Sequence, residues 1–270
     1  MPLPNTPLRW AGRISQIHKA YCTSHGSQRF PINVEGLAIQ VSQQFFPDEP
    51  ITDIIPKEYD SIEGALFSKE NKTKWGICYN SAISNEGRIN FTIAHELGHY
   101  LLHRKIIDNI ECQRNTLESF NGSNDQIEID ANIFACNLLM PKEDMAKILL
   151  ASEPTTSDTL KCLASRYNVS LSAICIQSIQ VVTKPSIVVS CIDGFMNWSC
   201  SNQKAMAAGF FFPTRQKTIK LPKKSLASNM GSKITMATHP PGVWHPEYKT
   251  EEILIYNNDE YTLSLVNLIT

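Results

Sequence analysis

Apolar residues recur at intervals of three and four in several segments, and this spacing predicts amphipathic helices. The clearest stripe lies in residues 91–104, and Asn90 is suited to cap the start of that helix. Pro31 is suited to the first turn of a helix formed by FPINVEGLAIQVSQQF. Further helices are predicted over residues 11–24, 125–140 and 142–150, with Pro141 ending the second of these.

Short runs of β-branched and aromatic residues predict strands in both halves of the chain. In the first half these runs are ITDII, SIEGALF and KWGICYN, and in the second half they include SIVVSCI and KTIKL. KWGICYN precedes the 91–104 helix, so we expect it to be the sheet edge along which an extended peptide binds. Near the end of the chain, NND separates two β-rich runs of EEILIYNNDEYTLSLVNL, which predicts a hairpin.

The polar cluster SEPTTSD is the best candidate for a domain boundary. We expect a first domain over residues 1–152, a helix-turn-helix-like segment over 153–184 and a mostly β region over 185–270. In the middle segment, two short helices flank a tight turn at residues 167–170, and Ser170 is suited to cap the second helix. The predicted fold class is α+β, with the 91–104 helix packed on a small sheet.

The composition is that of a globular protein and excludes several classes. The chain has 270 residues, of which 42% are hydrophobic and 19% are charged, and its formal net charge is −1. This balance argues against disorder and provides no basic field for nucleic acid or a membrane surface. The start of the chain lacks a secretory signal pattern, and no apolar run is long enough to span a bilayer. The eight cysteines form no CxxC pair, so we expect reduced thiols in a cytoplasmic protein.

The sequence HELGH at residues 95–99 carries the strongest chemical signal in the chain. On a helix, His95 and His99 lie on one face a turn apart, so both imidazoles can bind one metal ion. Zinc supplies a Lewis acid and lowers the pKa of a bound water, and Glu96 is well placed to take the proton of that water. Gly98 weakens the helix and lets another segment approach the metal side closely.

Two histidines do not hold a catalytic zinc ion, so a third ligand is required. The metzincin pattern would place a histidine at position 105, which is occupied by Lys105. His103 lies one turn beyond His99, but three histidines in line along one helix cannot all reach one ion. We therefore expect His103 to support the site rather than to bind the metal.

The helix EIDANIFACNLLMP offers a better third ligand. Glu128 and Asn132 lie four positions apart on one face of that helix. A carboxylate there can bind the metal, while Asn132 can hydrogen-bond a ligand histidine and select its tautomer. Asp125 and Asp130 are the rival carboxylates.

Several of these segments resemble the ImmA/IrrE family of zinc metallopeptidases, namely PINVEGLAIQVSQQ, KWGICYN, RINFTIAHELGHYLLH and EIDANIFACNLLMP. The resemblance implies a compact zincin-like peptidase domain in which His95, His99 and Glu128 bind Zn²⁺ and Glu96 is the general base. Members of the family are typically cytoplasmic regulatory proteases, and several cleave a helix-turn-helix transcriptional repressor. The implied function is therefore zinc-dependent cleavage of a regulatory protein, with such a repressor as the expected substrate.

Two alternatives remain open. The chain can be a non-catalytic, zinc-containing module that docks a repressor or DNA, or a zinc hydrolase that acts on a small molecule. DNA contact is not expected, because the second helix of the helix-turn-helix-like segment has no Lys or Arg before Lys184. The basic stretch at residues 214–224 is interpreted as a solvated strand face and loop. Candidates for the residue that stabilises an oxyanion are Tyr79, Tyr100 and His103.

Overall fold

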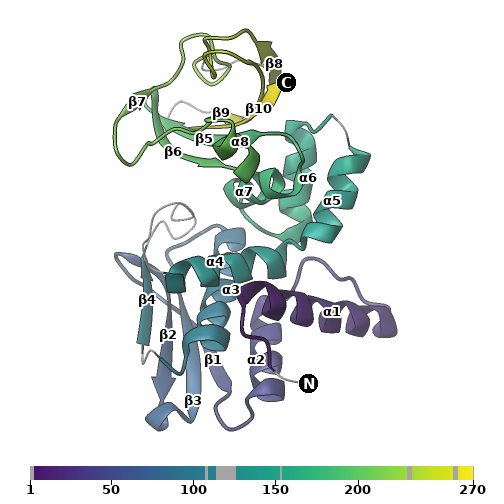
Figure 1. Ribbon diagram of the computed structural model, residues 1–270. Coiled ribbons are helices and arrows are strands. Elements are labelled where there is room, and N and C mark those ends of the chain that lie inside the picture. The colour runs from purple at the N-terminus through teal and green to yellow at the C-terminus, as the bar shows by residue number, and fades with distance from the viewer. Residues whose placement is uncertain are drawn as a thin grey trace. The chain divides into compact units, whose positions relative to one another are not determined.

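The protein is described by a computed structural model that covers residues 3–106, 109–113, 126–152, 154–229, 233–257 and 261–269. The chain divides into two compact units. The N-terminal unit contains residues 1–141 and 165–170, and the C-terminal unit contains residues 142–164 and 171–270. Helices and strands occur in both units, which confirms the predicted α+β class (Figure 1). Among the described helices, none has the length and apolar character needed to cross a membrane.

The N-terminal unit combines helices with a four-stranded mixed sheet of order β1-β3-β2-β4. Strand β1 runs parallel to β3, and β2 runs antiparallel to both β3 and β4. The elements are α1 (Pro7–His25), α2 (Val34–Phe45), β1 (Ile51–Lys57), β2 (Ile62–Lys69), η1 (Glu70–Lys72), β3 (Lys74–Asn80), α3 (Glu86–His103), β4 (Asn109–Gln113) and α4 (Gln126–Leu139).

The predicted edge strand is wrong. The segment KWGICYN forms β3, which lies between β1 and β2 and uses both of its backbone edges for pairing. A strand whose two edges are already paired cannot accept a further strand. The end strands of the described sheet are β1 and β4.

Two helix starts also differ from the prediction. Helix α3 begins at Glu86, and the side chain of Asn85 caps it by accepting a hydrogen bond from the backbone N–H of Arg88. Asn90 lies inside the helix instead, because the polar first turn EGRIN extends the helix beyond its apolar stripe. Helix α2 begins after Asn33, which caps it, so Pro31 precedes the helix rather than occupying its first turn.

Helix α3 is fastened to the unit at both of its ends. At its start, Arg88 pairs with the buried carboxylate of Glu63 on β2. At its end, Arg104 pairs with Glu49 at 3.0 Å and lies 3.6 Å above the ring centroid of Phe46. Between these anchors, α3 packs against β2 and β3 and against α4, and Leu97 is fully buried. The helix that carries HELGH is therefore held in a fixed position over the sheet.

The C-terminal unit contains a six-stranded antiparallel sheet of order β7-β6-β5-β10-β9-β8, together with short helices. Its last two strands pair antiparallel, as the hairpin pattern predicted. The predicted strand KTIKL is shorter than expected, because only two of its residues pair with β6. The elements are α5 (Lys142–Ala151), α6 (Ser157–Tyr167), α7 (Leu171–Val181), β5 (Ser186–Ile192), β6 (Phe195–Ser201), α8 (Gln203–Ala207), β7 (Ile219–Lys220), β8 (Met236–His239), β9 (Lys249–Asn257) and β10 (Tyr261–Ile269). The last turn of α6, from residue 165 on, belongs to the N-terminal unit.

A buried carboxylate organises the loops of the C-terminal unit. Glu252 on β9 is 0% exposed, and both of its carboxylate oxygens accept hydrogen bonds. Such dense pairing satisfies a buried charge and ties loops to the sheet. The donors are the backbone N–H groups of Leu226 and Ala227, His239 Nε2, Trp244 Nε1 and the hydroxyl of Ser264, at 2.8–3.0 Å.

Candidate metal centre

The two histidines of HELGH converge on one point. His95 and His99 lie one turn apart on α3, and their Nε2 atoms are 2.9 Å apart. The side chains are 2% and 0% exposed, so the pair faces the interior of the unit. Two imidazole nitrogens at this separation can contact the same ion.

A carboxylate from α4 completes the group. The two oxygens of Glu128 lie 3.2 Å from His95 Nε2 and 3.3 Å from His99 Nε2. The close approach of the two helices depends on Gly98, because a Cβ there would lie 3.0 Å from Phe134 Cδ1 and 3.2 Å from Ala131 Cα.

The donor set fits a zinc ion. One ligand atom from each of His95, His99 and Glu128 lies within 4.8 Å of the others. In a tetrahedral site with bonds of about 2.0–2.1 Å, ligand atoms are separated by about 3.3 Å. The three separations of 2.9–3.3 Å are therefore close to what zinc requires. Two nitrogens and one carboxylate also leave a coordination position for water.

The rival carboxylates do not join this group in the described part of the chain. Asp130 accepts a hydrogen bond from Gln126, and its other oxygen lies 4.0 Å from His103 Nε2. It therefore faces His103 rather than the two ligand histidines. Asp125 lies outside the described residues.

The outward nitrogens of the two histidines also have partners. Nδ1 of His95 lies 2.9 Å from Oδ1 of Asn132, and Nδ1 of His99 lies 3.1 Å from Nδ1 of His103. Both partners are buried. Because each Nδ1 is engaged, each Nε2 is directed toward the carboxylate of Glu128, an arrangement by which supporting residues can orient metal ligands.

The charges of the group set its protonation. Burial disfavours an ionised Glu128, but the hydrogen bonds from His95 and His99 outweigh it and hold the pKa of Glu128 well below its usual range. Burial lowers the pKa of His99 to about 4, so this imidazole is neutral at physiological pH. Burial also acts to lower the pKa of His95, but the hydrogen bond to Glu128 and the nearby charge of Glu96 raise it. An ionised carboxylate and a neutral imidazole are the forms that bind zinc, so these shifts place Glu128 and His99 in the forms that binding needs.

Glu96 lies beside the ligands with its carboxylate fully buried. Helix α3 directs it toward β2, where a Cβ on Gly64 would lie 3.0 Å from Glu96 Oε1 and would overlap Thr92 Cγ2. Gly64 therefore provides the space that the Glu96 carboxylate occupies. The sequence contains no signal for this role, because Gly64 is simply one residue of the strand-like run SIEGALF.

The three oxyanion candidates are placed differently. Tyr79 lies directly opposite Gly64 in the β2–β3 ladder, and opposed residues of antiparallel strands project to the same face. Tyr79 is therefore on the face of the sheet that carries α3. The hydroxyl of Tyr100 donates to the carbonyl oxygen of Glu49 at 2.7 Å, and His103 contacts His99.

Two polar side chains in the second helix of the helix-turn-helix-like segment are buried. On α7, Gln177 and Ser178 are 3% and 1% exposed, so neither is available to read base edges. In the basic stretch at residues 214–224, Lys217 and Lys220 are exposed, in agreement with a solvated surface.

A comparison with models of protein families gives a match that contains the candidate metal centre. Residues 48–178 match the protein-family model named Peptidase_M78, the IrrE N-terminal-like domain, and this confirms the family resemblance. The matched range includes His95, Glu96, His99 and Glu128. A comparison with curated proteins gave no match.

The whole chain also resembles known structures in its fold. One matching structure is a Mycobacterium tuberculosis transcriptional regulator, with 12% sequence identity and a TM-score of 0.52. The alignment covers 95% of this chain and 88% of that chain. At this identity the likeness concerns the fold, and it supports the α+β architecture.

Proposed function

We propose that this chain, whose residues 48–178 match the model of the Peptidase_M78 (IrrE N-terminal-like domain) family, is a zinc-dependent endopeptidase that cleaves a regulatory protein. The observation that carries the proposal is the convergence of His95, His99 and Glu128 on one point. Glu96, on the same helix, adds a buried carboxylate beside that point. Membership of a peptidase family supports the same reaction class.

In the proposed mechanism, His95 and His99 bind the ion through Nε2, and Glu128 adds a negative charge to the ligand set. Zinc, when bound, acts as a Lewis acid toward the scissile carbonyl and lowers the pKa of the attacking water. Glu96 takes the proton from that water and returns it to the leaving amine. Tyr79 is our candidate for the donor that stabilises the oxyanion, because it projects from the sheet face that carries α3.

Residues outside the ligand set prepare the site for this reaction. The contacts of Asn132 and His103 hold the two imidazoles in the orientation that binding needs. The ion pairs of Arg88 with Glu63 and of Arg104 with Glu49 connect both ends of α3 to neighbouring segments. Gly64 keeps the space for the Glu96 carboxylate. Preorganisation of this kind places a general base at the reacting atoms without a rearrangement during turnover.

The substrate class is proposed from the family. We expect a protein substrate, with a helix-turn-helix transcriptional repressor as the leading candidate. The location that we propose, also from the family, is the cytoplasm. We expect no direct role in DNA binding, because α7 carries no basic side chain.

Zinc content tests the ligand set first. The parent protein should retain about one zinc ion per chain after purification without added metal, whereas Glu128→Ala should retain much less. Asp130→Ala is the matched control, because it removes the neighbouring rival carboxylate on the same helix and should keep its zinc. Loss of zinc in Asp130→Ala but not in Glu128→Ala would reject this ligand set.

Cleavage tests the chemistry. Zinc-loaded parent protein is incubated with a peptide library prepared from a cell lysate and with intact helix-turn-helix repressors, and new termini are identified by mass spectrometry. Glu96→Gln should keep its zinc and lose cleavage, whereas Glu86→Gln, an exposed change on the same helix, should behave as the parent does. Equal cleavage by parent and Glu96→Gln would overturn the general-base role. No cleavage by any zinc-loaded protein would favour the non-catalytic docking module.

A further inference from the structure

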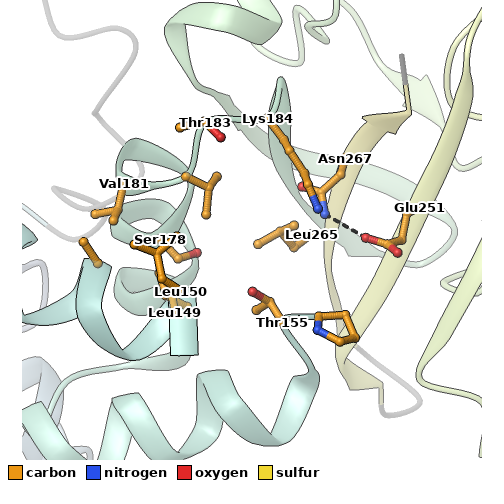
Figure 2. A pocket seen from close by; sticks show the side chains of 13 residues that line it. Leu149, Leu150, Thr155, Ser178, Val181, Thr183, Lys184, Glu251, Leu265 and Asn267 are labelled. Carbon is orange, nitrogen blue, oxygen red and sulfur yellow. Dashed lines mark hydrogen bonds between the residues drawn. The ribbon is translucent and has the colours of Figure 1, made fainter. Parts of the chain in front are cut away.

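The C-terminal unit contains a cavity that shares no residue with the metal centre. Its volume is about 130 Å³, and its lining comes from α5, α7, β9, β10 and the two loops that follow α5 and α7 (Figure 2). All of the lining residues belong to the C-terminal unit. The cavity can therefore be analysed within that unit alone.

Most of the cavity wall is aliphatic. Leu149 on α5, Val181 on α7 and Leu265 on β10 contribute branched side chains to it (Figure 2), and Ala146 on α5 also lines it. Leu149 and Leu265 are 3% and 4% exposed, so this end of the wall is protected from solvent. An engineered apolar cavity of about 150 Å³ binds benzene. A wall of this kind and size suits a branched aliphatic group of about four carbons.

One side of the cavity is polar and carries both signs of charge. In Figure 2, Lys184, Glu251 and Asn267 gather on the side opposite Leu150 and Val181. A cation and an anion presented side by side complement a ligand that itself carries one charge of each sign.

Hydrogen bonds of Asn267 fix the position of the Glu251 carboxylate on the polar side of the cavity. Asn267 is 7% exposed, and its Nδ2 donates to Glu251 Oε2 at 3.2 Å. Its Oδ1 accepts from the hydroxyl of Ser186 at 2.7 Å, so the amide orientation is set from the other end. The carboxylate of Glu251 is thereby held at the cavity by a buried side chain.

We propose that this cavity binds a free α-amino acid with a branched aliphatic side chain, such as leucine. The ammonium group pairs with Glu251, the carboxylate pairs with Lys184, and the side chain enters the wall formed by Leu149, Val181 and Leu265. In this assignment, both charged side chains and the aliphatic wall of the cavity contact the ligand. It goes beyond the proposed peptidase function, and it holds whether or not the chain is an enzyme.

Titration calorimetry on the full-length chain tests the ligand class. L-leucine should bind with a stoichiometry of about one, at concentrations up to about 10 mM. Two analogues of L-leucine test the two charged groups separately. The analogue 4-methylpentanoate lacks the ammonium group, and 3-methylbutylamine lacks the carboxylate. Each should bind at least about tenfold more weakly than L-leucine, because each lacks one of the two charged groups that Glu251 and Lys184 would bind.

Variants test whether L-leucine binds in this cavity. Ala146→Phe fills the aliphatic space and should abolish binding, whereas Ala151→Phe, at the exposed end of the same helix, should not. Lys184→Met and Glu251→Gln should each weaken binding by about tenfold or more. Lys147→Met is the matched control for the loss of a positive charge, because Lys147 is exposed on α5 and does not line the cavity.

Three results would overturn the proposal. The first is the absence of binding by L-leucine, L-isoleucine and L-valine at these concentrations. The second is binding of L-leucine that survives Ala146→Phe in a protein whose thermal unfolding matches that of the parent. The third is binding of 4-methylpentanoate or 3-methylbutylamine as tight as that of L-leucine, because the cavity would then recognise only one charge.

Discussion

Oδ1 of Asn132 on α4 lies 2.9 Å from Nδ1 of His95 on α3. Glu128, one turn earlier on α4, contacts Nε2 of the same imidazole at 3.2 Å. One face of α4 therefore reaches both ring nitrogens of His95. This arrangement selects the tautomer and the ring orientation of the ligand through contacts within the protein.

Replacing Asn132 should therefore weaken metal binding. We expect Asn132→Leu to lower zinc affinity by about 10- to 100-fold, because the His95 ring loses the partner that orients it. Competition with a chromogenic chelator measures the affinity. Asn137→Leu on the same helix is the control and should bind zinc as the parent does, since the side chain of Asn137 donates a hydrogen bond to the carbonyl oxygen of Ile133 on its own helix. Equal affinities for Asn132→Leu and the parent would contradict the orienting role.

Adding a methyl group at Gly64 should separate catalysis from metal binding. The new Cβ would press on Thr92 and on the Glu96 carboxylate, and no atom of His95, His99 or Glu128 is among its three nearest neighbours. We expect Gly64→Ala to keep its zinc and to reduce kcat by about 100-fold, the scale expected for a displacement of a catalytic group by about 1 Å. Steady-state kinetics and zinc content together check this expectation. Gly12→Ala should leave both unchanged, because an added Cβ there would meet no atom of the described residues within 4 Å apart from its chain neighbours and its own helix backbone.

The contact at Gly98 should decide how close α4 can lie to α3. An added Cβ would meet the backbone of Ala131 at 3.2 Å, and backbone atoms cannot rotate away. Gly98→Ala should lower the free energy of unfolding by about 1–3 kcal/mol as the helices are forced apart, despite the better helix propensity of alanine. Urea unfolding measures this loss, and zinc affinity should fall with it because Glu128 moves away. An increase in stability, as expected for Gly12→Ala, would show that α4 tolerates the methyl group.

The buried Glu252 should be sensitive even to an isosteric change. In Glu252→Gln, either orientation of the amide places an NH₂ group against a backbone N–H, of Ala227 or of Leu226, that can only donate. We expect a loss of about 3 kcal/mol or more in the stability of the C-terminal unit. Hydrogen exchange at the amides of Leu226 and Ala227 should accelerate accordingly. The exposed Glu247→Gln should have no effect, and protection unchanged in Glu252→Gln would refute the role of this carboxylate.

The cysteines of the C-terminal unit should differ in reactivity. Burial raises the pKa of Cys175 and of Cys191 to about 12, whereas Cys162 is exposed. The thiolate is the reactive form, and a raised pKa removes it at neutral pH. Iodoacetamide at about pH 8 should therefore label Cys162 in the folded protein and leave Cys175 and Cys191 unmodified until urea is added. Peptide mass spectrometry reads out each site. Labelling of Cys175 as fast as that of Cys162 would contradict the burial.

The prediction of the α3 start shows where sequence patterns fail. The apolar stripe begins at Phe91, so the cap was expected at Asn90, although the helix starts five residues earlier at Glu86. The first turn is polar and carries no periodic signal, and only the hydrogen bond from Arg88 to Asn85 identifies the cap. Similarly, the sequence of β3 has the composition of a strand, but nothing in it tells which neighbours it pairs with.

The sequence by itself determined the features that reside within one element. Four-residue spacing on a helix is enough to bring His95 and His99 to one face, and the β-rich runs on both sides of NND are enough to predict the C-terminal hairpin. What only the tertiary structure decided depends on two segments that meet in space. It brought Glu128 of α4 next to the two histidines of α3, placed Gly64 against Glu96 and assembled the aliphatic cavity in the C-terminal unit. The physical reason is that helical and strand periodicity orient side chains within an element, whereas the packing of one element against another is set by close contacts between residues far apart in the chain.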